Sequence, residues 1–292
     1  MRSARGVFDI MALQWRKNMR RAQFWIVIIM VPLLAYRFMI PVVRFTRATG
    51  VNATPAGIAF FFSDYTLSMI MCMGLLLLFS QAPFMDEQMT YVLLRCDNRQ
   101  WYLGSMLYCI TLAGFYVIYW LLCLLLPLAG NLEWSAEWGK IWNTLCKTTA
   151  YTEYKMRVKM PYILLSYRGI QALGLSVVLK LLFTIFISCI VFTWNIPWRI
   201  PVGSLAMVAL VLEDFFAMNG RGFIFYWYSP STMSRLCMLD NTDTLHTAMR
   251  AGGQSRAGGA GCFDDSDWMR DDFPHRHQQT NAIINEFGRE AR

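Results

Sequence analysis

Five long apolar stretches dominate the sequence, and they constrain its fold more than any other feature. They cover residues 24–43, 58–79, 106–128, 170–193 and 202–218. A helix needs about 20 apolar residues to cross the roughly 30 Å hydrocarbon core of a bilayer. Four stretches reach that length with few or no charges, and the fifth is marginal. The sequence therefore predicts an all-α polytopic transmembrane helix bundle with five spans, whose termini would lie on opposite sides of the membrane.

The composition points to the same class. Charged residues make up 16% of the chain and hydrophobic residues 56%, whereas a soluble domain usually carries about 25% charged residues. The net charge of +8 raises the question of nucleic acid, but basic residues that flank spans also set topology. We therefore expect no nucleic-acid partner and a transmembrane domain over residues 23–238.

Residues 1–22 precede the first span and are strongly basic. They hold six Arg and Lys residues against the single acid Asp9, an excess that favours a cytoplasmic N-terminus. Apolar residues recur at helical spacing, which predicts an amphipathic helix lying in the membrane interface; they are Val7, Phe8, Met11, Trp15 and Met19. The alternative interpretation is a disordered basic arm.

Residues 81–104 connect the second and third spans. Pro83 ends the span, and the acidic pair that follows suits the N-terminus of a short helix. The pattern predicts an amphipathic helix under the membrane that docks to a cytoplasmic partner, or a plain connector. The candidate docking residues are Phe84, Asp86, Glu87, Met89, Leu93, Arg95 and Arg99.

Residues 129–168 form the largest connection. Trp134, Trp138, Trp142 and Leu145 recur at helical intervals, which predicts a helix on the outer surface with tryptophans at headgroup level. The prolines and tryptophans of WNIPWRIP at 194–201 predict a tight turn between the last two spans.

Two basic residues lie inside predicted spans. Arg37 stands near the far end of the first span, where it either reaches the boundary or contacts substrate. Lys180 stands about halfway along the fourth span. An intramembrane lysine is a functional-site hypothesis, and the alternatives are a later helix start or a partner inside the bundle. Glu213 and Asp214 mark the water boundary at the end of the fifth span, or else a proton relay.

The sequence lacks the common motifs of catalysis and cofactor binding. No GxxxxGK[ST], HExxH, GxSxG or DxDxDG pattern occurs, and the spans offer, at membrane depth, no paired acids and no acid with a histidine. The three histidines all lie in the tail. We therefore expect neither an enzyme nor a bound metal or cofactor, and directed work would need energy from another chain.

Several features together resemble the membrane subunit of type-2 ABC exporters. The basic helix at 5–21, the segment 84–99 running into WYLGSMLY, and YSPSTMSRL at 228–236 carry the resemblance. It implies a permease subunit of a bacterial inner-membrane exporter that pairs with itself or a sister permease. A separate cytoplasmic ATP-binding subunit would drive it through a coupling helix at 84–99. The rival interpretation is a non-transporting membrane assembly or sensor protein.

The sixth span of that family has no counterpart here. Residues 239–292 are polar and glycine-rich, a composition typical of disorder. The two interpretations are a truncated or frame-shifted gene and an atypical five-span protein with an exposed tail.

Overall fold

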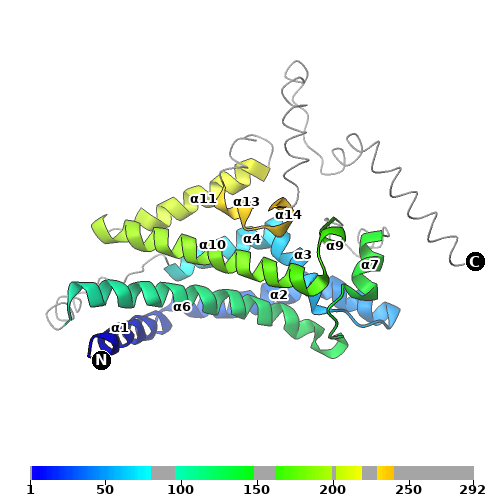
Figure 1. Cartoon of the computed structure of the whole chain (residues 1–292), viewed down its shortest axis with the longest axis horizontal. Helices are drawn as coiled ribbons and strands as arrows, with labels where there is room; N and C mark the ends of the chain where they lie inside the picture. Colours follow the sequence, from blue (N-terminus) through cyan, green and yellow to red (C-terminus); the bar gives the residue numbers. More distant parts are fainter. Residues whose placement is uncertain (1, 80–95, 148–161, 199–201, 219–228, 240–292) are drawn as a thin grey trace, which may run out of the picture.

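The computed structural model describes residues 2–79, 96–147, 162–198, 202–218 and 229–239 (Figure 1). Every regular element within these ranges is helical, and extended backbone pairs only in an isolated bridge between Ala53 and Leu132. Figure 1 shows the long helices lying side by side along one axis. The predicted all-α class is confirmed for the described residues.

Two helices form the N-terminal part of the bundle. Helix α1 (Arg2–Met19) is followed after a short turn by α2 (Ala22–Thr49). The buried face of α2 repeats at helical spacing from Phe24 through Val31 to Val42. The helix ends at Gly50, whose φ of 66° is left-handed and whose N–H donates to the carbonyl oxygen of Thr46.

Helix α1 packs against α6 through a face that differs in part from the predicted apolar face. Ile10 is buried there together with the polar Gln14 and Asn18, whereas Phe8 is 57% and Met19 43% exposed. The contact is centred on Gly104 of α6, whose lack of a side chain lets the two helices approach closely.

The second apolar stretch is not one helix, as the sequence predicted, but two. A short 3-10 turn η1 (Pro55–Gly57) leads into α3 (Ile58–Ser63), and α4 (Tyr65–Phe79) follows after a bend of 78°. The break falls at Asp64. The two pieces together still cover the predicted residues 58–79.

Three further helices correspond to the remaining predicted spans. Helix α6 (Asn98–Leu125) begins earlier than predicted and continues into η2 (Leu126–Asn131). Helix α10 (Gly169–Trp198) continues through Pro197, so the first half of the turn predicted at 194–201 is helical. Helix α11 (Val202–Met218) has the predicted bounds.

The tryptophan-rich connection packs into the bundle instead of lying on its surface. Helix α7 (Gly139–Lys147) begins only after Trp138, and Trp138 and Trp142 are both buried. Trp142 donates from Nε1 to the carbonyl oxygen of Thr54 at 3.0 Å, and a Cβ on Gly57 would collide with its indole ring. The predicted surface helix is therefore wrong for these residues, because protein carbonyls satisfy the indole N–H groups. Of the three tryptophans in this connection, Trp134 is the exposed one, at 79%.

Within the described residues, three helices are long and apolar enough to cross a membrane, namely α2, α6 with η2, and α10. The bent pair α3–α4 makes four if it counts as one span. Their outer faces carry large apolar side chains, such as Ile29, Ile118 and Leu182. Such a surface suits lipid and not water. These helices are those of a membrane protein.

Candidate functional site

The break between α3 and α4 begins with a carboxylate that caps a helix. Asp64 has an extended backbone (φ −70°, ψ 133°), and its Oδ2 accepts a hydrogen bond from the N–H of Leu67 at 3.1 Å. An aspartate in this position satisfies an N–H group that the first turn of a helix leaves unpaired. Asp64 therefore ends one helix and starts another inside a run of apolar residues.

Lys180 of α10 lies at this break. Its side chain is 2% exposed, and its Nζ donates to Ser68 Oγ at 2.7 Å and to Ser234 Oγ at 3.0 Å. Ser68 belongs to α4. Ser234 belongs to the segment that follows the short helix α13 (Pro230–Met233). One ammonium group therefore joins three segments that are far apart in the sequence.

The two serines are oriented to accept from the ammonium. Ser68 Oγ donates to the carbonyl oxygen of Asp64 at 2.9 Å, and Ser234 Oγ donates to that of Ser231 at 2.7 Å. A hydroxyl has one proton and two lone pairs, so each oxygen is left to accept from Lys180. This arrangement provides hydrogen bonds for a charge whose transfer into an apolar interior is costly.

Arg235 adds a second buried cation next to Ser234. Its side chain is fully buried, and Nη2 donates to Thr232 Oγ1 at 3.3 Å. The guanidinium carbon lies 5.4 Å from the centre of the Tyr65 ring, at the start of α4, which is a cation–π distance. Helix α14 (Leu236–Leu239) then follows, and Cys237 Sγ lies 3.6 Å from the carbonyl oxygen of Ser63, at the end of α3.

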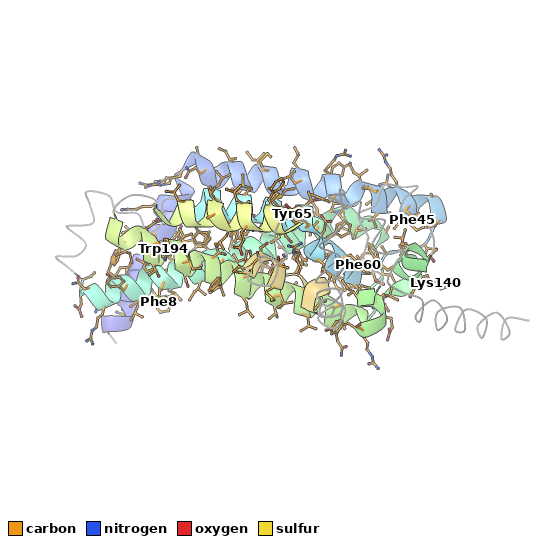
Figure 2. The ribbon with its side chains drawn as sticks, turned by 90° about the horizontal axis from the view of Figure 1, so that it is seen from above. Phe8, Phe45, Phe60, Tyr65, Lys140 and Trp194 are labelled. Atoms are coloured by element: carbon orange, nitrogen blue, oxygen red, sulfur yellow. The ribbon has the colours of Figure 1, made fainter. Side chains whose placement is uncertain are left out.

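The site lies near the middle of the long axis of the bundle. Figure 2 shows Tyr65 roughly midway, with Phe8 and Trp194 toward one end and Phe45 and Lys140 toward the other. If the long helices cross a bilayer along this axis, the site falls at membrane depth. Ionisable groups at such depth are rare and mark binding sites, ion pathways or proton relays.

The predicted site residues fall in different places. Phe84, Asp86, Glu87, Met89, Leu93 and Arg95 lie outside the described residues. Arg99 is exposed in the first turn of α6, so it belongs to that long helix and not to a separate helix before it.

Arg37 does not lie near the end of its helix. Because α2 continues to Thr49, about three turns separate the two residues. Its side chain is exposed on the outer face, beside the exposed Leu33 and Tyr36. The structure therefore keeps Arg37 away from Lys180 and from the bundle interior.

Sequence reasoning found Lys180 but missed its surroundings. Asp64 is a lone carboxylate inside the apolar stretch 58–79, and its position was a signal of the helix break. The hydroxyl-rich run from Ser229 to Ser234, followed by Arg235, was also a signal. Within the described residues, no three His, Cys, Asp or Glu side chains come together as a metal site would require.

Comparisons with known proteins add no family to this description. No family model matches the sequence, and neither a curated protein nor a solved structure shows significant similarity to it.

Proposed function

We propose that this protein is a membrane transport subunit, the permease of an ABC-type exporter that a separate ATP-binding subunit energises. The observation that supports a transport function is that Lys180 and Arg235 are buried at a broken helix in the middle of the bundle. Discontinuous helices whose ends meet at mid-membrane form the substrate and ion sites of many transporters. The ABC assignment rests on the sequence resemblance at 5–21, 84–99 and 228–236.

The proposal includes a topology and a set of partners. The chain would cross the bacterial inner membrane five times, with α11 as the fifth span and the N-terminus in the cytoplasm. Helix α1 would lie at the cytoplasmic end of the bundle, packed along the first half of α6, with its arginines near lipid phosphates. A second copy or a sister permease would complete the transport path, gated by alternating access.

Co-purification of the full chain with an ATP-binding subunit tests the proposal. The tagged chain is extracted from native membranes, and the ATPase rate of the purified complex is measured. Scrambling residues 84–95 changes the coupling segment and leaves α6 intact, since that helix begins at Asn98. Scrambling residues 281–292 is a control of equal length.

The expected result is loss of the ATP-binding subunit from the 84–95 variant only, with insertion into the membrane unchanged. An ATP-binding subunit that co-purifies equally with both variants contradicts the coupling assignment. If no such subunit co-purifies with the wild-type chain, the rival function, a membrane assembly or sensor protein, is favoured. The Lys180 hydrogen bonds fit that rival as well, because they tie α4 and α10 to the 229–239 segment.

A further inference from the structure

The outward face of α2 carries a short band of apolar side chains between two exposed arginines. Arg20 precedes the band and Arg37 ends it. Residues 22–36 extend about 22 Å along the helix axis, which is about 8 Å less than the hydrocarbon core of a typical bilayer. The band consists of side chains that are at least 44% exposed, namely Trp25, Ile26, Ile29, Met30, Leu33 and Tyr36. Its two aromatic residues stand near its ends, as they do at the boundaries of a membrane.

Helix α6 places the end of the band at Arg37 on the same level. Tyr119 OH donates to the carbonyl oxygen of Ile28 at 2.7 Å, and the Phe24 ring stacks on the Phe115 ring with centroids 6.3 Å apart. Both pairs lie 91 positions apart in the sequence, so the two helices run parallel in one register. The same register sets Arg37 level with η2, where the apolar stretch of α6 also ends.

The other end of the band lies beside the first half of α6, along which α1 packs in parallel. Ile10 meets Gly104, and the helices stay together as far as the hydrogen bond from Trp15. Continuing this register sets the exposed Arg16 and Arg20 level with residues 110–114. Two arginines of α1 therefore lie beside a part of α6 that belongs to its apolar stretch.

These arginines have no protein partner to offset their charge. Arg16, Arg20 and Arg37 form no hydrogen bond or ion pair within the described part of the chain. An arginine that faces hydrocarbon is costly, and local thinning of the bilayer removes that cost by bringing headgroups and water to the guanidinium group. Helix α11, with 17 residues and a length of about 26 Å, is also short for a full bilayer.

We propose that the α1–α2 side of the bundle binds phospholipid headgroups at Arg20 and Arg37 across a locally thinned bilayer. The guanidinium group suits this role, because its paired N–H donors match the oxygens of a phosphate. The exposed apolar band between the two arginines would contact the acyl chains. This lipid surface is a property of the helix faces, and it does not rest on transport.

Thermal unfolding of the full-length chain in vesicles tests the surface. The chain is reconstituted in phosphatidylcholines whose monounsaturated acyl chains have about 14 to 22 carbons, which sets the thickness of the bilayer. The 11 tryptophans provide the fluorescence signal. Each variant is compared with the wild-type chain in the same lipid, so that only the altered position contributes to the difference.

Two arginines of α2 provide matched variants. Arg37→Leu extends the apolar band by about two turns, as far as the exposed Arg44. We expect this variant to melt about 5 °C above the wild type in the longest lipids and at the wild-type temperature in the shortest. Arg47→Leu removes the same charge in the last turn of the helix, beyond the band, and should show no dependence on chain length. Arg37→Lys keeps the charge and should follow the wild type.

A second pair tests the other end of the band. Arg20→Leu should show the same rise in the longest lipids. Arg5→Leu, an exposed position in the first turn of α1, should not.

The proposal is supported if the effect of Arg37→Leu and of Arg20→Leu grows with acyl-chain length while both controls stay flat. It is overturned if either variant changes the melting temperature equally at every chain length or not at all, as expected if another protein and not lipid covers this face. It is also overturned if Arg37→Lys behaves like Arg37→Leu. No ATP-binding subunit takes part, so the result is independent of the co-purification test.

Discussion

Two serine hydroxyls accept hydrogen bonds from Lys180, and each donates its own proton to a backbone carbonyl oxygen. In these two series of hydrogen bonds the Lys180 ammonium is the first donor, and it sets the direction of the hydrogen bonds that follow. Thr184, one turn further along α10, donates to the carbonyl oxygen of Lys180 at 2.6 Å. The position of the Lys180 charge therefore depends on the hydroxyl groups of small side chains, and a hydropathy average over the sequence does not reveal them.

The coupling between Lys180 and Ser68 can be measured by a double-mutant cycle. We expect Ser68→Ala to lower the free energy of unfolding by about 1–2 kcal/mol, because a bond to a charged donor is lost. In a Lys180→Met background the same change should cost less than about 0.5 kcal/mol. Unfolding of the full chain in mixed micelles gives both values. Equal costs in the two backgrounds would show that the bond contributes nothing, and Ser188→Ala reports the cost of losing an unrelated hydroxyl.

Among the helices, the contact between α1 and α6 depends on one glycine. A Cβ on Gly104 would lie 2.8 Å from Cβ of Ile10 and 2.9 Å from the carbonyl oxygen of Val7. Trp15 adds a hydrogen bond from Nε1 to Thr111 Oγ1 at 3.1 Å. Because the second close atom belongs to the backbone, a larger residue at 104 cannot be accommodated by a change of rotamer.

Substitution of Gly104 should therefore release α1 from the bundle. We expect Gly104→Val to weaken docking by about 1–3 kcal/mol, the usual cost of overpacking, and to speed trypsin cleavage at Arg16 and Lys17. Gly114→Val on the same helix is the control, since only Leu181 Cδ1, at 4.0 Å, approaches a Cβ there. If both variants are cleaved at the wild-type rate, α1 is not held by this contact.

Hydropathy predicted the helices well and their interruptions poorly. It placed α11 within its observed bounds, because a long apolar run needs no knowledge of its neighbours. It missed the break at Asp64, since one carboxylate hardly changes the average over a window of about 20 residues. It misplaced Trp138 and Trp142 because helical periodicity shows one apolar face without saying whether lipid or protein covers it. The partners of Lys180 could not be predicted, because Ser68 lies 112 residues away.

For the whole molecule, the number of membrane crossings depends on α11. Its 17 residues make it shorter than α2, α6 and α10, and at 1.5 Å per residue it spans about 26 Å. A helix of that length reaches across a hydrocarbon core of about 30 Å only with local thinning of the bilayer or with help from its flanking residues.

Reporter fusions should locate each crossing. With a cytoplasmic N-terminus, a reporter inserted at Asp97 is expected inside, and one at the exposed Trp134 outside, because α6 with η2 separates them. A reporter after residue 292 is expected outside if α11 crosses. Alkaline phosphatase and green fluorescent protein report the two sides in a complementary way. Cytoplasmic signal at 292 with outside signal at 134 would show four crossings and not five.

The bend at Asp64 also bears on how the chain is synthesised. Helices α3 and α4 have 6 and 15 residues, and each alone is shorter than the about 20 that a stable bilayer span needs. Their hydrogen-bonded partners emerge much later, since Lys180 is 112 residues beyond Ser68 and Ser234 a further 54. The hydrogen bonds that join this segment to Lys180 and Ser234 can therefore form only after residue 234 has been synthesised.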